Sequence, residues 1–198
     1  MARMRSKIIA IEGIDQAGKR TQADLLAAQV RRMRKPVSVW SFPNYETPIG
    51  KQLNTYLKGR TLMDLRAVHL LYAANKWEVA GKISAKMDRG EIVIVNRYTP
   101  SNLAYGVAHG LPLHWLSALE EGLPKPNVVV VIDVSPQTSL VRKHEGRDIH
   151  EGDLVYLEKV RRAYRLLAKK YRWNIVDGRE EPEEVRRLIW EKVYGTFR

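Results

Sequence analysis

Four short apolar runs, rich in β-branched residues, recur along the chain and are separated by longer segments with helical spacing. The runs occupy residues 8–11, 37–40, 92–95 and 128–132. They lack polar alternation, which is typical of strands that are buried on both faces of a sheet. Strands that alternate with helices predict a parallel sheet with helices packed on it. With residues 173–176 as a short fifth strand, the sequence predicts a doubly wound, five-stranded α/β fold.

Three longer segments have the apolar spacing of amphipathic helices. They comprise residues 64–88, residues 153–171 and a final segment that opens at Pro182 with two glutamates after it. Proline fits the first turn of a helix, where no N–H is needed, and carboxylates there favour the positive end of the helix dipole. Because no linker-like tract or internal repeat divides the sequence, we expect a single domain over residues 1–198.

Composition limits the classes of partner. The formal net charge of +12 favours anionic ligands, which include nucleotides and nucleic acids. The basic clusters at residues 31–35 and 161–172 are also typical of solvated helix faces, and no nucleic-acid recognition motif is present, so we expect no nucleic-acid partner.

The chain has no Cys, which fits a reducing compartment, and we expect a cytoplasmic protein. The apolar run at residues 8–11 is too short for a signal or membrane segment, so we expect no membrane association.

Two glycines and a lysine stand at the spacing of a phosphate-binding loop (P-loop), directly after the first predicted strand. Such glycines let backbone N–H groups approach phosphate oxygens, and the following helix adds positive potential. The lysine would reach the β- and γ-phosphates of ATP. A turn beside a surface lysine is the alternative, but the flanking strand and helix favour the P-loop. The expected ATP-binding residues are Gly13, Ile14, Asp15, Gln16, Ala17, Gly18, Lys19, Arg20 and Thr21.

Position 20 departs from the P-loop pattern, which has Ser or Thr there to bind Mg²⁺. This chain has Arg20, and Thr21 follows one residue late. One residue is a rotation of about 100° around a helix, so we expect Thr21 to face an α-phosphate. The metal ligands stay unknown from the sequence, and we expect Mg²⁺ to be carried mainly by ATP, the co-substrate.

The third predicted strand ends in Asn96, Arg97 and Tyr98. Open α/β sheets bind ligands at the carboxyl ends of their strands, so we expect Arg97 to meet a phosphate. On the predicted helix at residues 64–88, Tyr72 and Lys76 are four positions apart and share a face. Tyr72 fits a ligand-facing position and a core position equally well.

In combination these motifs resemble the thymidylate kinases, and they look most similar to the eukaryotic and archaeal members. The resemblance spans nearly the whole chain. It rests on the P-loop with its internal Asp15, Phe42-Pro43, the stretch from Leu71 to Glu78, Arg97-Tyr98 with Ser101 and Ala104-Tyr105, and Gly122-Leu123-Pro124-Lys125-Pro126. It implies a P-loop kinase fold with a lid, transfer of the γ-phosphoryl group of ATP to dTMP in dTTP synthesis, and a homodimer.

The resemblance also implies roles at the acceptor site. Asp15 would hold the 3′-hydroxyl of deoxyribose, Tyr72 would stack on thymine, and Tyr105 would exclude a ribose 2′-hydroxyl. Lys76 stands where the family usually has an Arg at thymine O4, so we expect looser discrimination between dTMP and dUMP. The expected substrate-binding residues are Asp15, Phe42, Tyr72, Lys76, Arg97, Ser101, Asn102 and Tyr105. The resemblance also implies a cis peptide bond before Pro43.

The family's mobile lid corresponds to residues 142–152. Family members place a catalytic arginine either in the P-loop or in the lid, and because Gln16 occupies the P-loop position, the resemblance implies Arg147. Arg142 or Lys143 would stack on adenine. A solvated, charged loop is the alternative interpretation of this segment. The expected catalytic residues are Lys19, Arg97 and Arg147, because phosphoryl transfer depends on placement and charge neutralisation.

Two alternative functions remain open from the sequence. The departures at Arg20 and Asn96 are compatible with a degenerate paralogue that binds nucleotides without catalysis. The other alternative is a kinase with looser monophosphate specificity that accepts dTMP and dUMP. ATP turnover in the presence of dTMP separates an enzyme from a non-catalytic paralogue.

Overall fold

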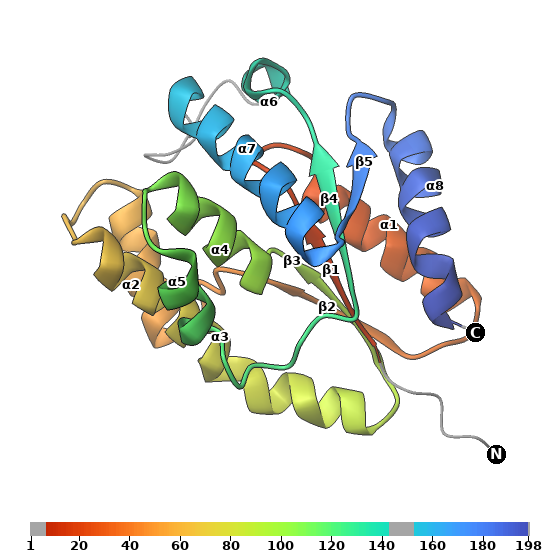
Figure 1. The fold of residues 1–198 in the computed structure, drawn as a ribbon. Coiled ribbons are helices and arrows are strands. Elements are labelled where there is room, and N and C mark those ends of the chain that lie inside the picture. Colours follow the sequence, from red (N-terminus) through yellow and green to blue (C-terminus); the bar gives the residue numbers. More distant parts are fainter. Residues whose placement is uncertain (1–6, 143–152, 198) are drawn as a thin grey trace.

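The computed structural model describes residues 7–142 and 153–197 (Figure 1). Within this part of the chain, five parallel strands form one sheet in the order β2-β3-β1-β4-β5. The strands are β1 (Ile8–Glu12), β2 (Val37–Ser41), β3 (Ile92–Asn96), β4 (Val128–Asp133) and β5 (Asn174–Asp177). The predicted α/β class and all five predicted strands are confirmed, with bounds that differ by one or two residues.

Helices fill the segments between the strands. They are α1 (Lys19–Arg32), α2 (Pro48–Leu57), α3 (Leu65–Asp88), α4 (Thr99–Ala108), α5 (Leu113–Leu119), α6 (Pro136–Arg142), α7 (Leu154–Tyr171), α8 (Pro182–Val193) and the 3₁₀ helix η1 (Tyr194–Phe197). The predicted long helices are α3 and α7, each capped by an aspartate whose carboxylate accepts a backbone N–H of the first turn. The last predicted helix is α8. None of the helices in the described ranges is long and apolar enough to cross a membrane.

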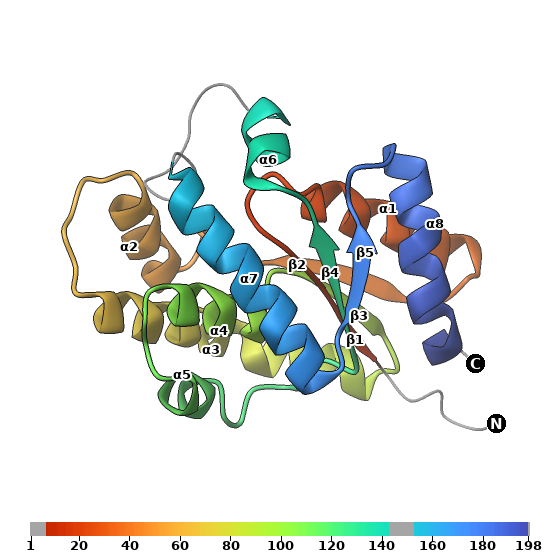
Figure 2. The same cartoon turned by 45° about the horizontal axis from the view of Figure 1, so that its top comes forward.

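The sheet lies between two helical layers. Helices α1 and α8 cover one face, while α3, α4 and α7 cover the other (Figure 2). Strand β1 is central, and the side chains of its first four residues, from Ile8 to Ile11, are fully buried. This explains why its sequence is apolar without alternation.

The strand order brings three loops to one edge. Strand β1 pairs with β3 on one side and with β4 on the other. The connections after β1 and β3 therefore leave the sheet in different directions, which opens a crevice at the carboxyl ends of the strands. The loops after β1, β3 and β4, which begin at Gly13, Arg97 and Val134, lie at this edge.

Candidate active site

The predicted P-loop connects β1 to α1 and has the backbone geometry that its glycines permit. Gly13 has φ 139°, and a Cβ at this position would lie 2.5 Å from the carbonyl oxygen of Ile132 in β4. Gly18 has φ 90°, a conformation that side-chain-bearing residues rarely adopt. Lys19 is buried, and its Nζ donates a hydrogen bond of 2.6 Å to the carbonyl oxygen of Ile14. The lysine is therefore folded over the loop that would hold the phosphates.

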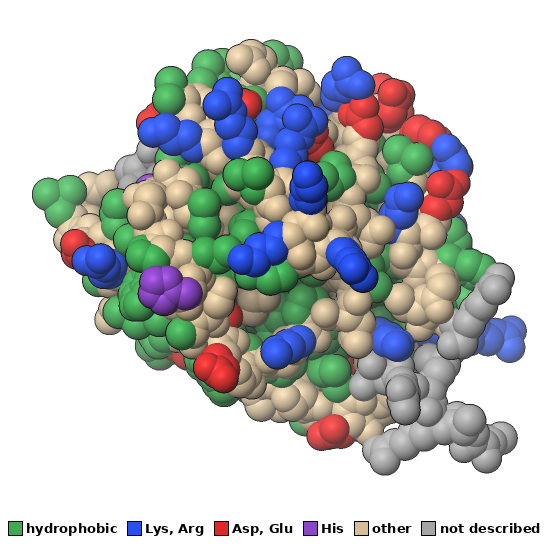
Figure 3. Space-filling view, in the orientation of Figure 1, with side chains coloured by type: hydrophobic (Ala, Val, Ile, Leu, Met, Phe, Trp, Pro, Cys, Tyr) green, Lys and Arg blue, Asp and Glu red, His purple; other side chains and the backbone are tan. Residues whose placement is uncertain are grey.

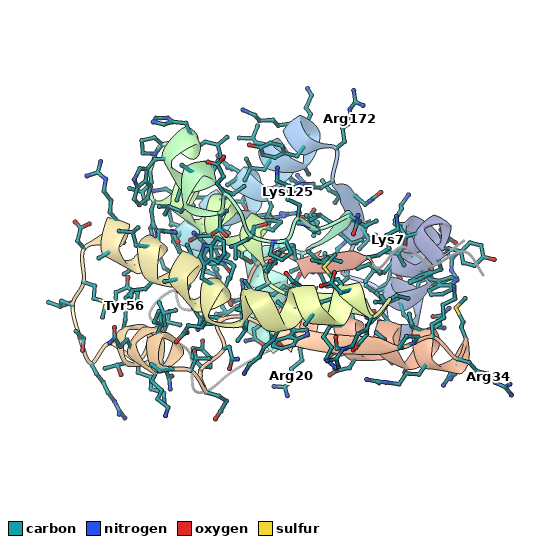
Figure 4. The ribbon with its side chains drawn as sticks, turned by 90° about the horizontal axis from the view of Figure 1, so that it is seen from below. Lys7, Arg20, Arg34, Tyr56, Lys125 and Arg172 are labelled. Atoms are coloured by element: carbon teal, nitrogen blue, oxygen red, sulfur yellow. The ribbon has the colours of Figure 1, made fainter. Side chains whose placement is uncertain are left out.

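Arg20 stands at the P-loop position where Ser or Thr usually binds Mg²⁺. Arg20 and Thr21 are exposed on the first turn of α1, and Figure 4 shows Arg20 directed away from the ribbon. The described residues contain no group of three or more His, Cys, Asp or Glu side chains that could hold a metal ion. The nearby carboxylates of Glu12 and Asp15 are already hydrogen-bonded to the protein. At the end of β3, Asn96 offers only a neutral amide oxygen.

A cavity with about 590 Å³ of free space, counting its open mouth, lies beside the P-loop. All the residues predicted to bind the acceptor lie around it, although their roles in binding stay predictions. Pro43, Tyr45, Leu57, Asn75 and Tyr98 also contribute to the wall. The predicted residues in the lining are Asp15, Phe42, Tyr72, Lys76, Arg97, Ser101, Asn102 and Tyr105.

At the P-loop end of this cavity, Arg97 is held by two partners. Its backbone has φ 61°, and its guanidinium pairs with the carboxylate of Asp15 and donates to the hydroxyl oxygen of Tyr105 at 3.0 Å. The Tyr105 hydroxyl in turn donates to Asp15 at 2.6 Å. Burial alone would lower the pKa of Arg97, but the charge of Asp15 and the neighbouring tyrosines together outweigh it and raise the pKa, so the guanidinium stays charged. The cavity thus contains a fixed cation beside the P-loop.

Behind Arg97, the carboxylate of Glu12 is fully buried at the end of β1. It accepts hydrogen bonds from the backbone N–H of Tyr98 at 2.7 Å, from Ser101 Oγ at 2.6 Å and from the Tyr164 hydroxyl at 2.9 Å. Burial raises the pKa of Glu12, although these donors oppose the shift. The carboxylate links β1 to the turn that contains Arg97. Glu12 was not predicted as a functional residue, and its charge at the end of an apolar strand was the available signal.

A buried ion pair lies at the wall of the cavity, with Lys76 in the lining. Lys76 Nζ lies 2.9 Å from Glu120 Oε1, and the two side chains are 3% and 6% exposed. Asn102 donates to the same oxygen at 2.6 Å. Lys76 was predicted as a donor toward a base, and the structure adds that Glu120 neutralises its charge. Glu120 was not predicted, because no local motif links the end of α5 to α3.

Two aromatic side chains flank the cavity. Tyr72 is half-buried on α3 and also packs against the cluster that joins α2 to α3. Phe42 is buried against Tyr98, with ring centroids 5.7 Å apart. The peptide bond between Phe42 and Pro43 is cis, as predicted.

The predicted lid lies mostly outside the described residues. Arg147 and Lys143 belong to residues 143–152, so the catalytic and adenine-stacking roles predicted for them stay predictions. Arg142 ends α6 and donates a hydrogen bond of 2.7 Å to the carbonyl oxygen of Gly178. Its contact with adenine likewise stays a prediction.

Comparison with known proteins gives one consistent result. Residues 11–189 match the family model described as thymidylate kinase. The thymidylate kinase of Arabidopsis thaliana is 33% identical over 96% of this chain and 71% of its own length, and that of Homo sapiens is 31% identical over 93% and 88%. A solved structure of thymidylate kinase from Candida albicans superposes with a TM-score of 0.86, at 28% identity over 96% of this chain and 92% of that chain. The Candida albicans enzyme is described as having broad substrate specificity.

Proposed function

The chain belongs to the thymidylate kinase family, and from this we propose that it transfers the γ-phosphoryl group of ATP to dTMP, giving dTDP and ADP, as a step in dTTP synthesis. The observation that carries the proposal is the arrangement of one cavity beside the P-loop. Asp15 and Arg97 line that cavity on the side of the P-loop, while Tyr72 and Lys76 also belong to its lining. A nucleoside monophosphate in the cavity would present its phosphate to the γ-phosphate of ATP.

The proposed reaction requires positioning more than covalent participation by the protein. A phosphate oxygen of dTMP attacks the γ-phosphorus of ATP, a new P–O bond forms, and the bond between the γ-phosphorus and the β,γ-bridging oxygen breaks. The acceptor is already an oxyanion, so no general base is needed. We assign charge neutralisation to Lys19 on the ATP side and Arg97 on the acceptor side, with Arg147 from the lid as the third cation.

The sugar and the base have separate proposed contacts. The carboxylate of Asp15 accepts from Arg97 and Tyr105, which orients it to accept a third hydrogen bond from the 3′-hydroxyl. Burial raises the pKa of Tyr105, so its hydroxyl stays neutral and would crowd a ribose 2′-hydroxyl. We assign Tyr72 to stacking on the base, because a ring face binds bases by stacking.

We propose that Mg²⁺ enters with ATP. The described residues at the P-loop offer Arg20 where a hydroxyl ligand is usual and Asn96 where a carboxylate would be stronger, so the phosphate oxygens supply the ion's ligands. The ion would neutralise charge on the nucleotide phosphates.

Looser monophosphate specificity is the second candidate. At position 76 this chain has the single ammonium group of a lysine, where the family usually has the planar guanidinium of an arginine with several N–H donors. Broad substrate specificity is also ascribed to the Candida albicans relative. We therefore propose that dUMP is also phosphorylated. The non-catalytic alternative is not favoured, because Lys19 and Arg97 are both in place beside the cavity.

The face shown in Figure 3 gives no support to nucleic-acid binding. Figure 3 shows Lys and Arg side chains spread over much of this face between apolar and polar neighbours, rather than gathered in one stripe. A basic stripe is the usual footprint of a nucleic-acid-binding protein. Nucleotides therefore remain the proposed partners of the positive charge, and we place the reaction in the cytoplasm, which supplies ATP.

A homodimer is the proposed assembly, and α3 is the surface that we propose for it. Exposed apolar residues recur on one stripe of α3, where Leu70 and Trp77 are each 49% exposed and seven residues apart. Seven residues are close to two helical turns, so both side chains face the same direction. Exposed apolar patches mark protein interaction sites, and we propose that these two side chains belong to one.

The proposed function is tested by an assay of ADP release that is coupled to NADH oxidation, over a panel of monophosphates. We expect turnover with dTMP and with dUMP, and poor turnover with thymidine ribomonophosphate and with dGMP. Equal rates with ribo- and deoxyribonucleotides would contradict the role of Tyr105. ADP release that does not depend on any monophosphate would contradict the kinase assignment.

A further inference from the structure

Four buried polar side chains form a continuous network that includes part of the cavity lining, and we call it the floor network. Its members are His69, Lys76, Asn102 and Glu120, which are between 0% and 8% exposed. Lys76 and Asn102 line the cavity, whereas His69 and Glu120 lie behind them. Buried polar groups of this kind fix one another's orientation through their hydrogen bonds.

The network fixes the side-chain amide of Asn102. Its Nδ2 lies 2.6 Å from Glu120 Oε1 and 3.2 Å from the carbonyl oxygen of His69. Both partners are acceptors, so both amide hydrogens are used. Its Oδ1 lies 2.6 Å from Nδ1 of His69, so that ring nitrogen must carry a proton. Asn102 can therefore offer the cavity only the second lone pair of Oδ1, which makes it an acceptor.

The network also fixes Lys76 as a donor. Its Nζ donates to the carbonyl oxygen of Tyr72 and to Glu120 Oε1, both at 2.9 Å. An ammonium group has three protons and no acceptor site, so one proton remains for the cavity. Glu120 supplies the counter-charge of this buried ammonium group.

We propose that Glu120 is a positioning residue for base recognition, because its Oε1 holds Lys76 as a donor and Asn102 as an acceptor on the cavity floor. This inference rests on the proposed function. Thymine and uracil present an acceptor oxygen, O4, next to a donor, N3–H. Cytosine presents the reverse order, an amino donor next to the acceptor N3. The floor network thus matches thymine and uracil and leaves unpaired polar groups against cytosine, which is a strong basis for rejection.

The test replaces Glu120 by glutamine, which keeps the shape but removes the counter-charge of Lys76, so the hydrogen bonds from Lys76 and Asn102 no longer go to a charged acceptor and are weaker. The matched control is Glu121→Gln, the same change at the exposed neighbouring residue. For each protein, kcat and KM are measured with dTMP, with dCMP and with ATP, and thermal unfolding confirms the fold. In Glu120→Gln we expect KM for dTMP to rise about 10-fold or more and the kcat/KM preference for dTMP over dCMP to fall about 10-fold or more. The kcat with dTMP and the KM for ATP should each stay within about 3-fold of the wild-type values. The control Glu121→Gln should match the wild type in all of these constants.

The outcomes separate this assignment from the proposed function. If the wild type phosphorylates dTMP and Glu120→Gln keeps the full preference over dCMP, the positioning role of Glu120 is wrong. An equal loss of kcat with both acceptors, without a change in KM, would mean that Glu120 only supports the fold. If the wild type itself phosphorylates no monophosphate, the proposed function fails first. Should Glu120→Gln not fold, the double variant Lys76→Met/Glu120→Gln, which leaves no unpaired charge, is measured instead, and a retained preference there overturns the proposal.

Discussion

Arg97 has a backbone conformation, φ 61°, that few non-glycine residues adopt. Backbone hydrogen bonds at Arg97 and at the next residue hold this conformation. The backbone N–H of Arg97 donates to Ile11, and the next residue, Tyr98, donates to the buried carboxylate of Glu12. The guanidinium is thus fixed before any acceptor phosphate arrives. A residue that is positioned in advance loses little entropy when the transition state forms.

Replacing Arg97 by alanine should therefore affect turnover rather than ATP binding. We expect kcat to fall about 100-fold or more, since removing one fixed donor from a transition state costs this much in other enzymes. ATP affinity, measured by calorimetry, should change little, because we assign Arg97 to the acceptor side of the site. Arg89→Ala, an exposed arginine just after α3, is the control and should behave as wild type. An Arg97→Ala protein with unchanged kcat would remove Arg97 from the site.

Arg20 and Asn96 are the residues expected to set the magnesium requirement. Neither supplies an anionic ligand, and Arg20 adds a positive charge at the start of α1. We expect Arg20→Ser, Asn96→Asp and the double variant to reach half-maximal activity at lower Mg²⁺ than the wild type. The measurement is a Mg²⁺ titration of activity at saturating ATP and dTMP. A double variant that titrates like the wild type would show that neither residue affects the metal.

At the scale of elements, α7 is joined to the carboxyl end of β4 by one acidic residue. Asp133 accepts two hydrogen bonds from Arg161, at 2.7 and 3.0 Å, and one from Arg165 at 2.8 Å. Burial alone would raise the pKa of Asp133, but the two arginines outweigh it and lower the pKa. A carboxylate whose pKa is lowered by folding stabilises the folded state above its unfolded pKa, and this contribution is lost as the pH falls through the folded value.

Asp133→Asn should therefore destabilise the protein by about 1 to 2 kcal/mol at pH 7, because the arginines are partly exposed and solvent screens them. The difference from wild type should begin to shrink as the pH falls below the pKa of an unfolded aspartate, about 4, and should be lost at the lower pH where the folded carboxylate is protonated. Urea unfolding at several pH values measures this. A difference that is constant with pH would mean that the ion pairs contribute nothing beyond neutral hydrogen bonds.

The five strands and the helices α3, α7 and α8 could be predicted because each has a periodic or continuous apolar pattern. The strand order could not, since it depends on which strands pair over long distances. The same limit applies to single residues. Asp15 and Arg97 were found by their positions after predicted strands, whereas Glu12 and Glu120 became visible only when the fold brought their partners together.

At the scale of the whole molecule, the stripe on α3 predicts self-association. A charge on that stripe should disrupt a dimer, so we expect Leu70→Arg to be monomeric at concentrations where the wild type is dimeric. Leu166→Arg is the control, because Leu166 is also exposed, at 68%, but lies on α7. Sedimentation velocity gives both masses. A wild type that sediments as a monomer, or a Leu70→Arg variant that stays dimeric, would contradict the proposed interface.

The protein is proposed to transfer a phosphoryl group between two nucleotides, one held in the cavity and the other at the neighbouring P-loop. The most direct measurement of this transfer follows the label from γ-³²P-ATP in the presence of dTMP, with products separated by chromatography. The proposed function predicts that label appears in the β-phosphate of dTDP, at a rate that falls about 100-fold or more in Arg97→Ala. Label that appears only as inorganic phosphate, or label that stays in ATP, would contradict it.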